Sequence, residues 1–194
     1  MADGTSIGNT TDILVVGGGP AACGEGLLPG RLAALRELAI HIATGDGQIF
    51  RRIHFIDGSI LAKAEFTGEG GIGVRRTVLH QKMVERAKQC GVRLLWKAPA
   101  AAILADGAVV GGKTVHAKWI VGADGVDSCV RAWSGLEAGV DRKMRLAQRR
   151  HYGAMLLRDG TEVSWGRKIQ AYVTPLAHDE TCVVMISRDP FIQL

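Results

Sequence analysis

No stretch of this 194-residue sequence is long and apolar enough to cross a membrane as a helix, so we expect no transmembrane segment. The first twelve residues are polar and acidic, unlike a secretory or transit peptide. The four cysteines are widely spaced and include no Cys-x-x-Cys pair. This spacing argues against a metal centre and against a disulfide framework, and it predicts a protein of the reducing cytoplasm.

Several common catalytic signatures are also missing. The sequence has no Gly-x-Ser-x-Gly, no Walker loop, and no His-Glu-x-x-His among its six histidines. The net charge of +5 is modest, and only residues 142–150 are densely basic. That run lacks interleaved aromatic residues, which favours a solvated surface over a nucleic-acid site. We therefore expect no nucleic-acid and no membrane partner, and we keep a basic nucleic-acid-binding module as the weakest alternative.

The most informative stretch covers residues 115–131, VHAKWIVGADGVDSCVR. An apolar strand is predicted to end in a Gly-Ala-Asp-Gly turn, and a short helix is predicted to follow. Gly122, Asp124 and Gly125 then lie at the carboxyl end of a buried strand, which is where open α/β sheets bind ligands. The alternative is that Asp124 only caps the following helix.

A second strand and turn come near the start of the chain. Residues 11–22 read TDILVVGGGPAA, an apolar strand followed by glycines and a Pro suited to the first turn of a helix. This fits the Gly-x-Gly-x-x-Ala pattern, in which glycines let the backbone approach a pyrophosphate at a helix N-terminus. The candidate residues are Gly17, Gly18, Gly19, Pro20, Ala21 and Ala22.

Four segments in matching order resemble the superfamily of FAD-dependent monooxygenases and oxidoreductases, which includes para-hydroxybenzoate hydroxylase and the geranylgeranyl reductases. They are GGGPAA at 17–22, GEGLLPG at 24–30, VRRTVLHQKMVERAKQCGV at 74–92 and WIVGADGVDSCVR at 119–131. The resemblance implies a flavoprotein oxidoreductase in which FAD is reduced by NADH or NADPH, activates oxygen and hydroxylates a small organic substrate. It assigns cofactor contacts to Glu25 and Arg76 as well as to the two glycine motifs, and it indicates no catalytic residue. The alternative for Arg76 is a surface arginine without a cofactor contact.

The resemblance also implies the fold class. We expect an α/β protein with a Rossmann-like, FAD/NAD(P)-binding three-layer fold and an inserted antiparallel substrate-side sheet. The FAD-binding domain is assigned to residues 1–48 and 67–140, and the substrate-side domain to 49–66 and 141–194. The loop at 67–73 is predicted to be flexible. Residues 12–17 and 117–122 are expected to be near neighbours in a parallel sheet, and residues 49–66 and 151–187 to form an antiparallel sheet. Asp57-Gly58 is predicted to be a hairpin turn, and residues 92–96 a short strand.

About 30 residues of the family pattern, a helix and the second strand, are missing between Ala22 and Gly24, and a later glycine-aspartate motif is missing at the other end. The fold is thus expected to be internally shortened and C-terminally truncated. Glu37 and Asp46 fall near the spacing of the acid that binds ribose, but neither is assigned that role. A non-catalytic remnant with weak or no FAD binding is therefore the main alternative. The absent strand should leave an exposed edge or apolar patch, which favours a homodimer or aggregation.

Overall fold

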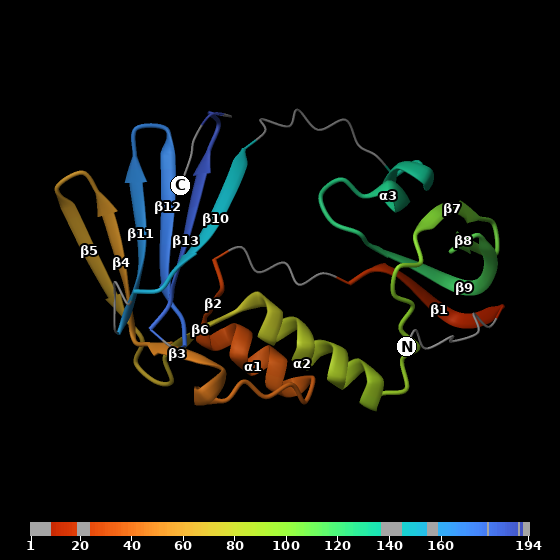
Figure 1. The fold of residues 1–194 in the computed structure, drawn as a ribbon, viewed down its shortest axis with the longest axis horizontal. Coiled ribbons are helices and arrows are strands. Elements are labelled where there is room, and N and C mark those ends of the chain that lie inside the picture. The colour runs from red at the N-terminus through yellow and green to blue at the C-terminus, as the bar shows by residue number, and fades with distance from the viewer. Residues whose placement is uncertain are drawn as a thin grey trace. The chain divides into compact units, whose positions relative to one another are not determined.

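The chain forms a mixed α/β structure with three sheets, which is divided between two compact units in a computed structural model (Figure 1). The structure describes residues 9–18, 24–136, 145–154, 159–177, 179–189 and 191. The first unit comprises residues 1–19 and 88–141, and the second comprises 20–87 and 142–194. Among the described residues, no helix has the length and apolar character needed to cross a bilayer.

The first unit contains a four-stranded sheet in the order β1-β9-β8-β7. Its elements are β1 (Thr10–Gly17), β7 (Ala100–Leu104), β8 (Gly107–Val110), β9 (Lys113–Ala123) and the short helix α3 (Cys129–Trp133). β1 and β9 pair in parallel, whereas the other pairs are antiparallel. The predicted parallel neighbourhood of residues 12–17 and 117–122 is confirmed. The strand predicted at 92–96 does not form, because this segment pairs with no other strand of the described chain.

One face of this sheet is packed and the other is not. Leu14 and Ile120 pack against the buried cluster of Ala108, Val110 and Val115. Because side chains alternate along a strand, the neighbouring positions point to the opposite face. There the exposed fractions are 58% for Ile13, 53% for Val15, 71% for Trp119 and 46% for Val121. β1 is also an edge strand, since within the described residues it pairs only with β9.

The second unit contains the other two sheets. Its small sheet has the order β2-β6-β3, and its large sheet has the order β10-β13-β12-β11-β4-β5. The strands are β2 (Gly26–Leu27), β3 (Gly47–Phe50), β4 (Arg52–Asp57), β5 (Ile60–Glu65), β6 (Gly71–Val74), β10 (Leu146–Tyr152), β11 (Gly160–Gly166), β12 (Ile169–Pro175) and β13 (Thr181–Ser187). The antiparallel sheet expected from residues 49–66 and 151–187 is confirmed with two changes. Its β4–β11 pair is parallel, and β3 belongs to the small sheet.

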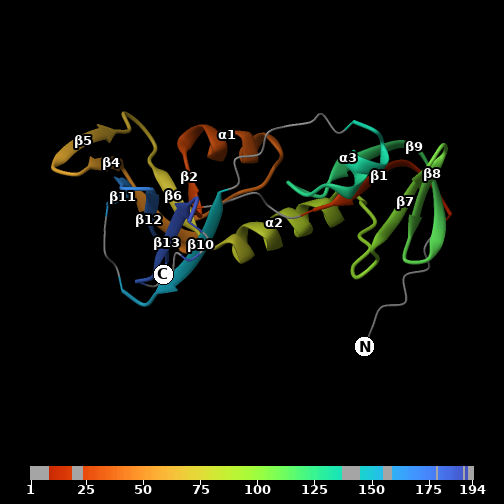
Figure 2. The ribbon, with the colours of Figure 1, turned by 90° about the horizontal axis from the view of Figure 1, so that it is seen from above.

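The helices α1 (Pro29–Glu37) and α2 (Arg76–Gln89) pack beside the small sheet. Leu32 of α1 and Leu79 of α2 join Leu27, Ile72 and Val74 in one buried cluster. The Arg86 guanidinium of α2 also donates a hydrogen bond to the Leu38 carbonyl at 2.8 Å. Figure 2 shows the two helices from above, next to the ends of β2 and β6.

The segment predicted as a flexible loop at 67–73 instead leads into a buried strand, β6. Glycine is required there by close packing rather than by flexibility. A Cβ on Gly71 would lie 2.4 Å from the Phe50 ring, and one on Gly73 would lie 1.8 Å from the Pro175 carbonyl oxygen. The prediction of a loop was wrong for residues 71–73, because glycine-rich sequence also marks places where backbones approach each other closely.

Candidate functional site

The carboxyl end of β1 carries the first two predicted cofactor residues. Gly17 has φ +106, and a Cβ there would come within 2.1 Å of the Ala123 carbonyl oxygen. A side chain at Gly17 would therefore break the contact between β1 and β9. Gly18 is different, because a Cβ on it would meet no atom within 4 Å. The remaining residues of this motif, Gly19, Pro20, Ala21 and Ala22, lie outside the described residues.

The second predicted motif lies directly beside the first. In the parallel register, Val16 faces Gly122 and Gly17 faces Ala123. A Cβ on Gly122 would lie 3.0 Å from Val130 of α3, whereas Gly125 has open space around it and φ +91. The fold thus brings together the glycines of two segments that are about 100 residues apart, at one edge of the sheet. Their role in cofactor binding stays a prediction.

Asp124 holds the turn between β9 and α3. Its Oδ1 accepts a hydrogen bond from the Ser128 hydroxyl, and its Oδ2 accepts one from the Val130 N–H at 3.2 Å. The hydrogen bond from Ser128 is the main reason why the pKa of Asp124 lies below its usual value. Ser128 caps α3 by accepting the Arg131 N–H at 3.0 Å. The helix-capping alternative therefore describes real contacts of this carboxylate, and any cofactor role would be additional to them.

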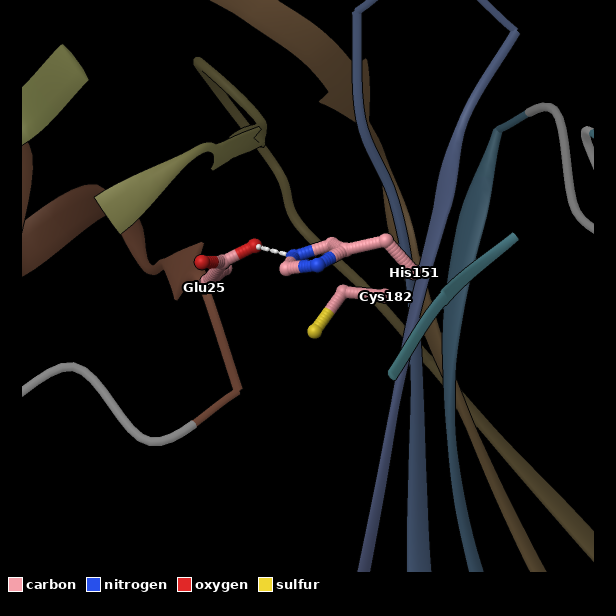
Figure 3. A group of neighbouring side chains, drawn as sticks. All are labelled: Glu25, His151 and Cys182. Carbon is pink, nitrogen blue, oxygen red and sulfur yellow. Dashed lines mark hydrogen bonds and ion pairs between the residues drawn. The ribbon is translucent and has the colours of Figure 1, made fainter. Parts of the chain in front are cut away.

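Glu25, the predicted cofactor residue of the Gly-Glu-Gly segment, lies in a buried ion-pair network in the second unit. Its side chain is 1% exposed and its backbone has φ +58, an uncommon conformation for a residue with a side chain. The Oε1 atom accepts the Arg76 N–H at 3.0 Å and lies 3.1 Å from Arg149 Nη1. The Oε2 atom lies 2.7 Å from His151 Nε2 (Figure 3).

Cys182 completes this group and was not singled out by sequence reasoning. His151 of β10 and Cys182 of β13 are Cα partners across the sheet, so both side chains extend toward Glu25 (Figure 3). Cys182 is fully buried, and burial followed by the charge of Glu25 raises its pKa to about 12. The thiol is therefore protonated and unreactive at neutral pH.

Arg76 begins α2, and its side chain is exposed. The preceding residue, Arg75, forms a two-pronged ion pair with Glu180, with Nε at 2.8 Å from Oε2 and Nη2 at 2.6 Å from Oε1. This pair is the main cause of the raised pKa of Arg75. Arg75 therefore ties the start of α2 to the turn before β13.

The predicted residues fall into two groups, each within one unit. Gly17, Gly18, Gly122, Asp124 and Gly125 meet in the first unit, and Glu25 meets the Arg76 backbone in the second. Sequence reasoning missed Arg149, His151 and Cys182. The cross-strand pairing of 151 with 182 depends on sheet register, for which these segments give no local signal.

Several solved structures have a fold similar to that of this chain. They include a geranylgeranyl bacteriochlorophyll reductase-like protein from Thermoplasma acidophilum (TM-score 0.77, 21% identity, 96% of this chain and 58% of that one). A second is PqsL from P. aeruginosa in complex with 2-aminobenzoylacetate (TM-score 0.73, 15% identity, 92% and 61%). A third is 2-methyl-3-hydroxypyridine-5-carboxylic acid oxygenase (TM-score 0.71, 21% identity, 94% and 61%). The chain thus spans a little under two thirds of the length of these proteins.

The search of curated proteins gave no significant match. The family model described as an FAD binding domain matches residues 55–189, which is well over half of the chain. This match includes β9, the Gly-Ala-Asp-Gly turn and the strands β10 to β13. The chain belongs to the FAD binding domain family.

Proposed function

We propose that this chain binds FAD as part of a flavoprotein oxidoreductase of the monooxygenase type. The observation that carries the proposal is the parallel pair of β1 and β9, which ends in two glycine segments at one edge of the sheet. This is the place where open α/β folds bind dinucleotides. The finer fold assignment, a Rossmann-like three-layer domain with a substrate-side sheet, is part of the same proposal.

The residues at this edge fit the pyrophosphate of FAD. Gly18 and Gly125 leave open space where a side chain would stand, so a phosphate oxygen can approach their backbone. Neither of the two acids near the expected spacing is assigned to the ribose hydroxyls. Asp46 is occupied by Lys82, at 2.9 Å, and by the Ala43 N–H, at 2.6 Å. Glu37 is the last residue of helix α1, whereas the acid that binds ribose normally lies at the end of a strand. We therefore expect FAD to be held mainly through its phosphates.

When bound, FAD would supply the redox chemistry, and the protein would supply binding and orientation. Gly18 and Gly125 would let the backbone approach the phosphates, and Asp124 would keep its turn rigid through Ser128 and Val130. The exposed Arg76 guanidinium is the cation that we assign to an anionic part of the cofactor. Reduction by NADH or NADPH, oxygen activation and hydroxylation of a small organic substrate complete the proposed activity. The proposed setting is the cytoplasm.

The visible absorption spectrum of the purified protein tests this proposal. The protein is mixed with FAD, the excess is removed by gel filtration, and the flavin retained per chain is measured. About one flavin per chain would support the proposal, and oxygen-dependent oxidation of NADH or NADPH would then test for turnover. A folded protein that retains no flavin would contradict it.

A second candidate is a non-catalytic remnant that keeps the scaffold without holding FAD firmly. The specific observation in its favour is the incomplete cover of the first unit's sheet. β1 lacks a second strand neighbour among the described residues, and Ile13, Val15, Trp119 and Val121 are largely exposed. Exposed apolar faces of this kind destabilise a free monomer and promote association. The flavin-loading experiment distinguishes the two candidates directly.

A further inference from the structure

Three side chains with different metal-binding atoms converge in the second unit. Glu25 precedes β2, His151 lies on β10 and Cys182 lies on β13. A carboxylate oxygen, an imidazole nitrogen and a thiol sulfur from these residues all lie within 4.8 Å of one another. The residues come from distant parts of the sequence, which is why their spacing gave no sign of a site.

The Glu25 carboxylate is held in one orientation. Its Oε1 is fixed by two donors, the Arg76 N–H at 3.0 Å and Arg149 Nη1 at 3.1 Å. Its Oε2 is directed at His151 Nε2, 2.7 Å away. Hydrogen bonds to the outer oxygen of a carboxylate commonly orient the inner oxygen toward a bound metal ion. The positive φ of Glu25 shows that the backbone accepts an uncommon conformation to place this side chain inside.

The sheet register fixes the other two groups relative to each other. His151 and Cys182 are opposite residues on antiparallel strands, so their side chains lie on the same face. Figure 3 shows the imidazole and the sulfur side by side, both extending toward Glu25. Cys182 also packs in the buried cluster with Leu176 and Val184, and its sulfur faces the contact between Glu25 and His151.

We propose that Glu25 Oε2, the His151 imidazole and Cys182 Sγ bind one divalent zinc ion, with a fourth position open to water or another small ligand. Sulfur, imidazole and carboxylate are the donors that zinc uses in proteins, and three protein ligands with one open position is a common arrangement. On binding, the Cys182 thiol proton passes to solvent, and the proton between His151 Nε2 and Glu25 Oε2 leaves that contact, either for Nδ1 of the same ring or for solvent. The two anionic ligands then balance the ion's charge, and Arg149 keeps its contact with Oε1.

Cobalt(II) provides a direct probe, because a thiolate ligand gives an intense charge-transfer band and a tetrahedral site gives strong visible bands. The experiment uses the full chain without a polyhistidine tag, kept reduced and stripped of metal with a chelator. We expect one equivalent of cobalt to bind with a near-ultraviolet charge-transfer band. Zinc should displace the cobalt and abolish the band.

Matched cysteine variants assign the band to its sulfur. Cys182→Ser should lose the charge-transfer band and bind cobalt at least about 100-fold more weakly, since a metal ligand is removed. Cys129→Ser, which changes an exposed cysteine, should bind like the unchanged protein. His151→Gln keeps the sulfur ligand but loses the imidazole, so its charge-transfer band should appear only at a much higher cobalt concentration. A band that persists in Cys182→Ser would overturn the proposal.

A second measurement does not depend on the variants folding. X-ray absorption of the zinc-loaded, unchanged chain should show one sulfur at about 2.3 Å and nitrogen or oxygen neighbours at about 2.0 Å. A shell without sulfur, or the absence of stoichiometric cobalt and zinc binding, would overturn the proposal. Neither outcome decides whether the glycine motifs bind FAD, because those motifs and the zinc ligands belong to different units.

Discussion

The Glu25 carboxylate lies 2.7 Å from His151 Nε2, although 126 residues separate the two in the sequence. This contact joins the short segment before β2 to the large sheet of the second unit. Arg149 and the Arg76 N–H hold the other carboxylate oxygen, so the start of α2 is tied to the same point. A change at Glu25 therefore affects three elements at once.

Glu25→Gln should lower the free energy of unfolding by roughly 2 kcal/mol, because it leaves Arg149 and His151 facing a neutral amide in a buried place. Full loss of a deeply buried ion pair costs more, but Arg149 and His151 are 32% and 21% exposed and can be partly solvated. Urea unfolding measures the difference. The matched control is Glu69→Gln, since Glu69 forms an exposed pair with Arg36 and should contribute under about 1 kcal/mol. Equal effects of the two changes would contradict the buried network.

Cys182 should resist alkylation under conditions in which exposed thiols react. Burial raises its pKa from the usual 9.0 to about 12, so at pH 8 almost no thiolate is present. Cys90 and Cys129 are exposed and should be modified by iodoacetamide within the same period. Peptide mapping by mass spectrometry of metal-free protein reports each cysteine separately. Rapid modification of Cys182 in the folded chain would show that the site is open.

The same raised pKa gives a direction for stability at alkaline pH. In the unfolded chain the Cys182 thiol loses its proton near pH 9, whereas in the folded chain it keeps it until about pH 12. The folded state therefore binds the proton more tightly than the unfolded state. The resulting contribution to the free energy of unfolding is complete below pH 9 and is lost as the pH rises toward 12. The urea midpoint of unfolding should therefore fall between pH 9 and pH 12, and it should fall less in Cys182→Ser than in the unchanged protein.

Gly18→Val separates cofactor binding from folding. A Cβ on Gly18 meets no atom within 4 Å, so the change should alter the free energy of unfolding by under about 1 kcal/mol. The added side chain would occupy the space through which a pyrophosphate reaches the backbone, and FAD affinity should fall roughly 100-fold, or about 2.7 kcal/mol. Flavin retention and thermal unfolding are measured on the same sample.

Gly17→Val is the companion variant and should fail in a different way. Its side chain would collide with the Ala123 carbonyl oxygen in a backbone conformation that valine does not tolerate, so roughly 3 kcal/mol or more of stability should be lost. If Gly18→Val retained FAD with unchanged affinity, the assignment of this edge of the sheet to the pyrophosphate would be wrong.

Asp124→Ala should abolish flavin binding, and so should Gly19→Val, which changes a residue outside the described part of the chain. Asp124 also stabilises α3, so loss of flavin could follow from local disorder alone. Ser128→Ala tests this, because it removes a partner of Asp124 and the helix cap but keeps the carboxylate. It should cost about 1 kcal/mol and retain flavin. Loss of flavin in both variants, measured by absorbance, would assign Asp124 a purely structural role.

The strands that carry apolar alternation or clear turn residues were predictable from sequence. The hairpin of β4 and β5 at Asp57-Gly58 and the last three strands followed from local pattern. The parallel pairing of β1 with β9 followed instead from the fold that the family resemblance implies. The role of Gly71 and Gly73 was not predictable, because their cause is the distant Phe50 ring and Pro175 backbone. The same limit applies to the Glu25 site. Its partners Arg149, His151 and Cys182 depend on the register of β10 and β13, which lie far from Glu25 in the sequence.

The exposed face of β1 and β9 should drive self-association of the isolated chain. Ile13 and Trp119 are register partners on this face and are 58% and 71% exposed. Replacing both by threonine keeps good strand propensity and removes apolar area, so association should weaken by at least about tenfold. Sedimentation velocity over a range of concentrations measures this. Val126→Thr is the control, because Val126 is 76% exposed but lies in the turn after β9. A monomeric unchanged protein at high concentration would contradict the prediction and would imply that another part of the molecule covers this face.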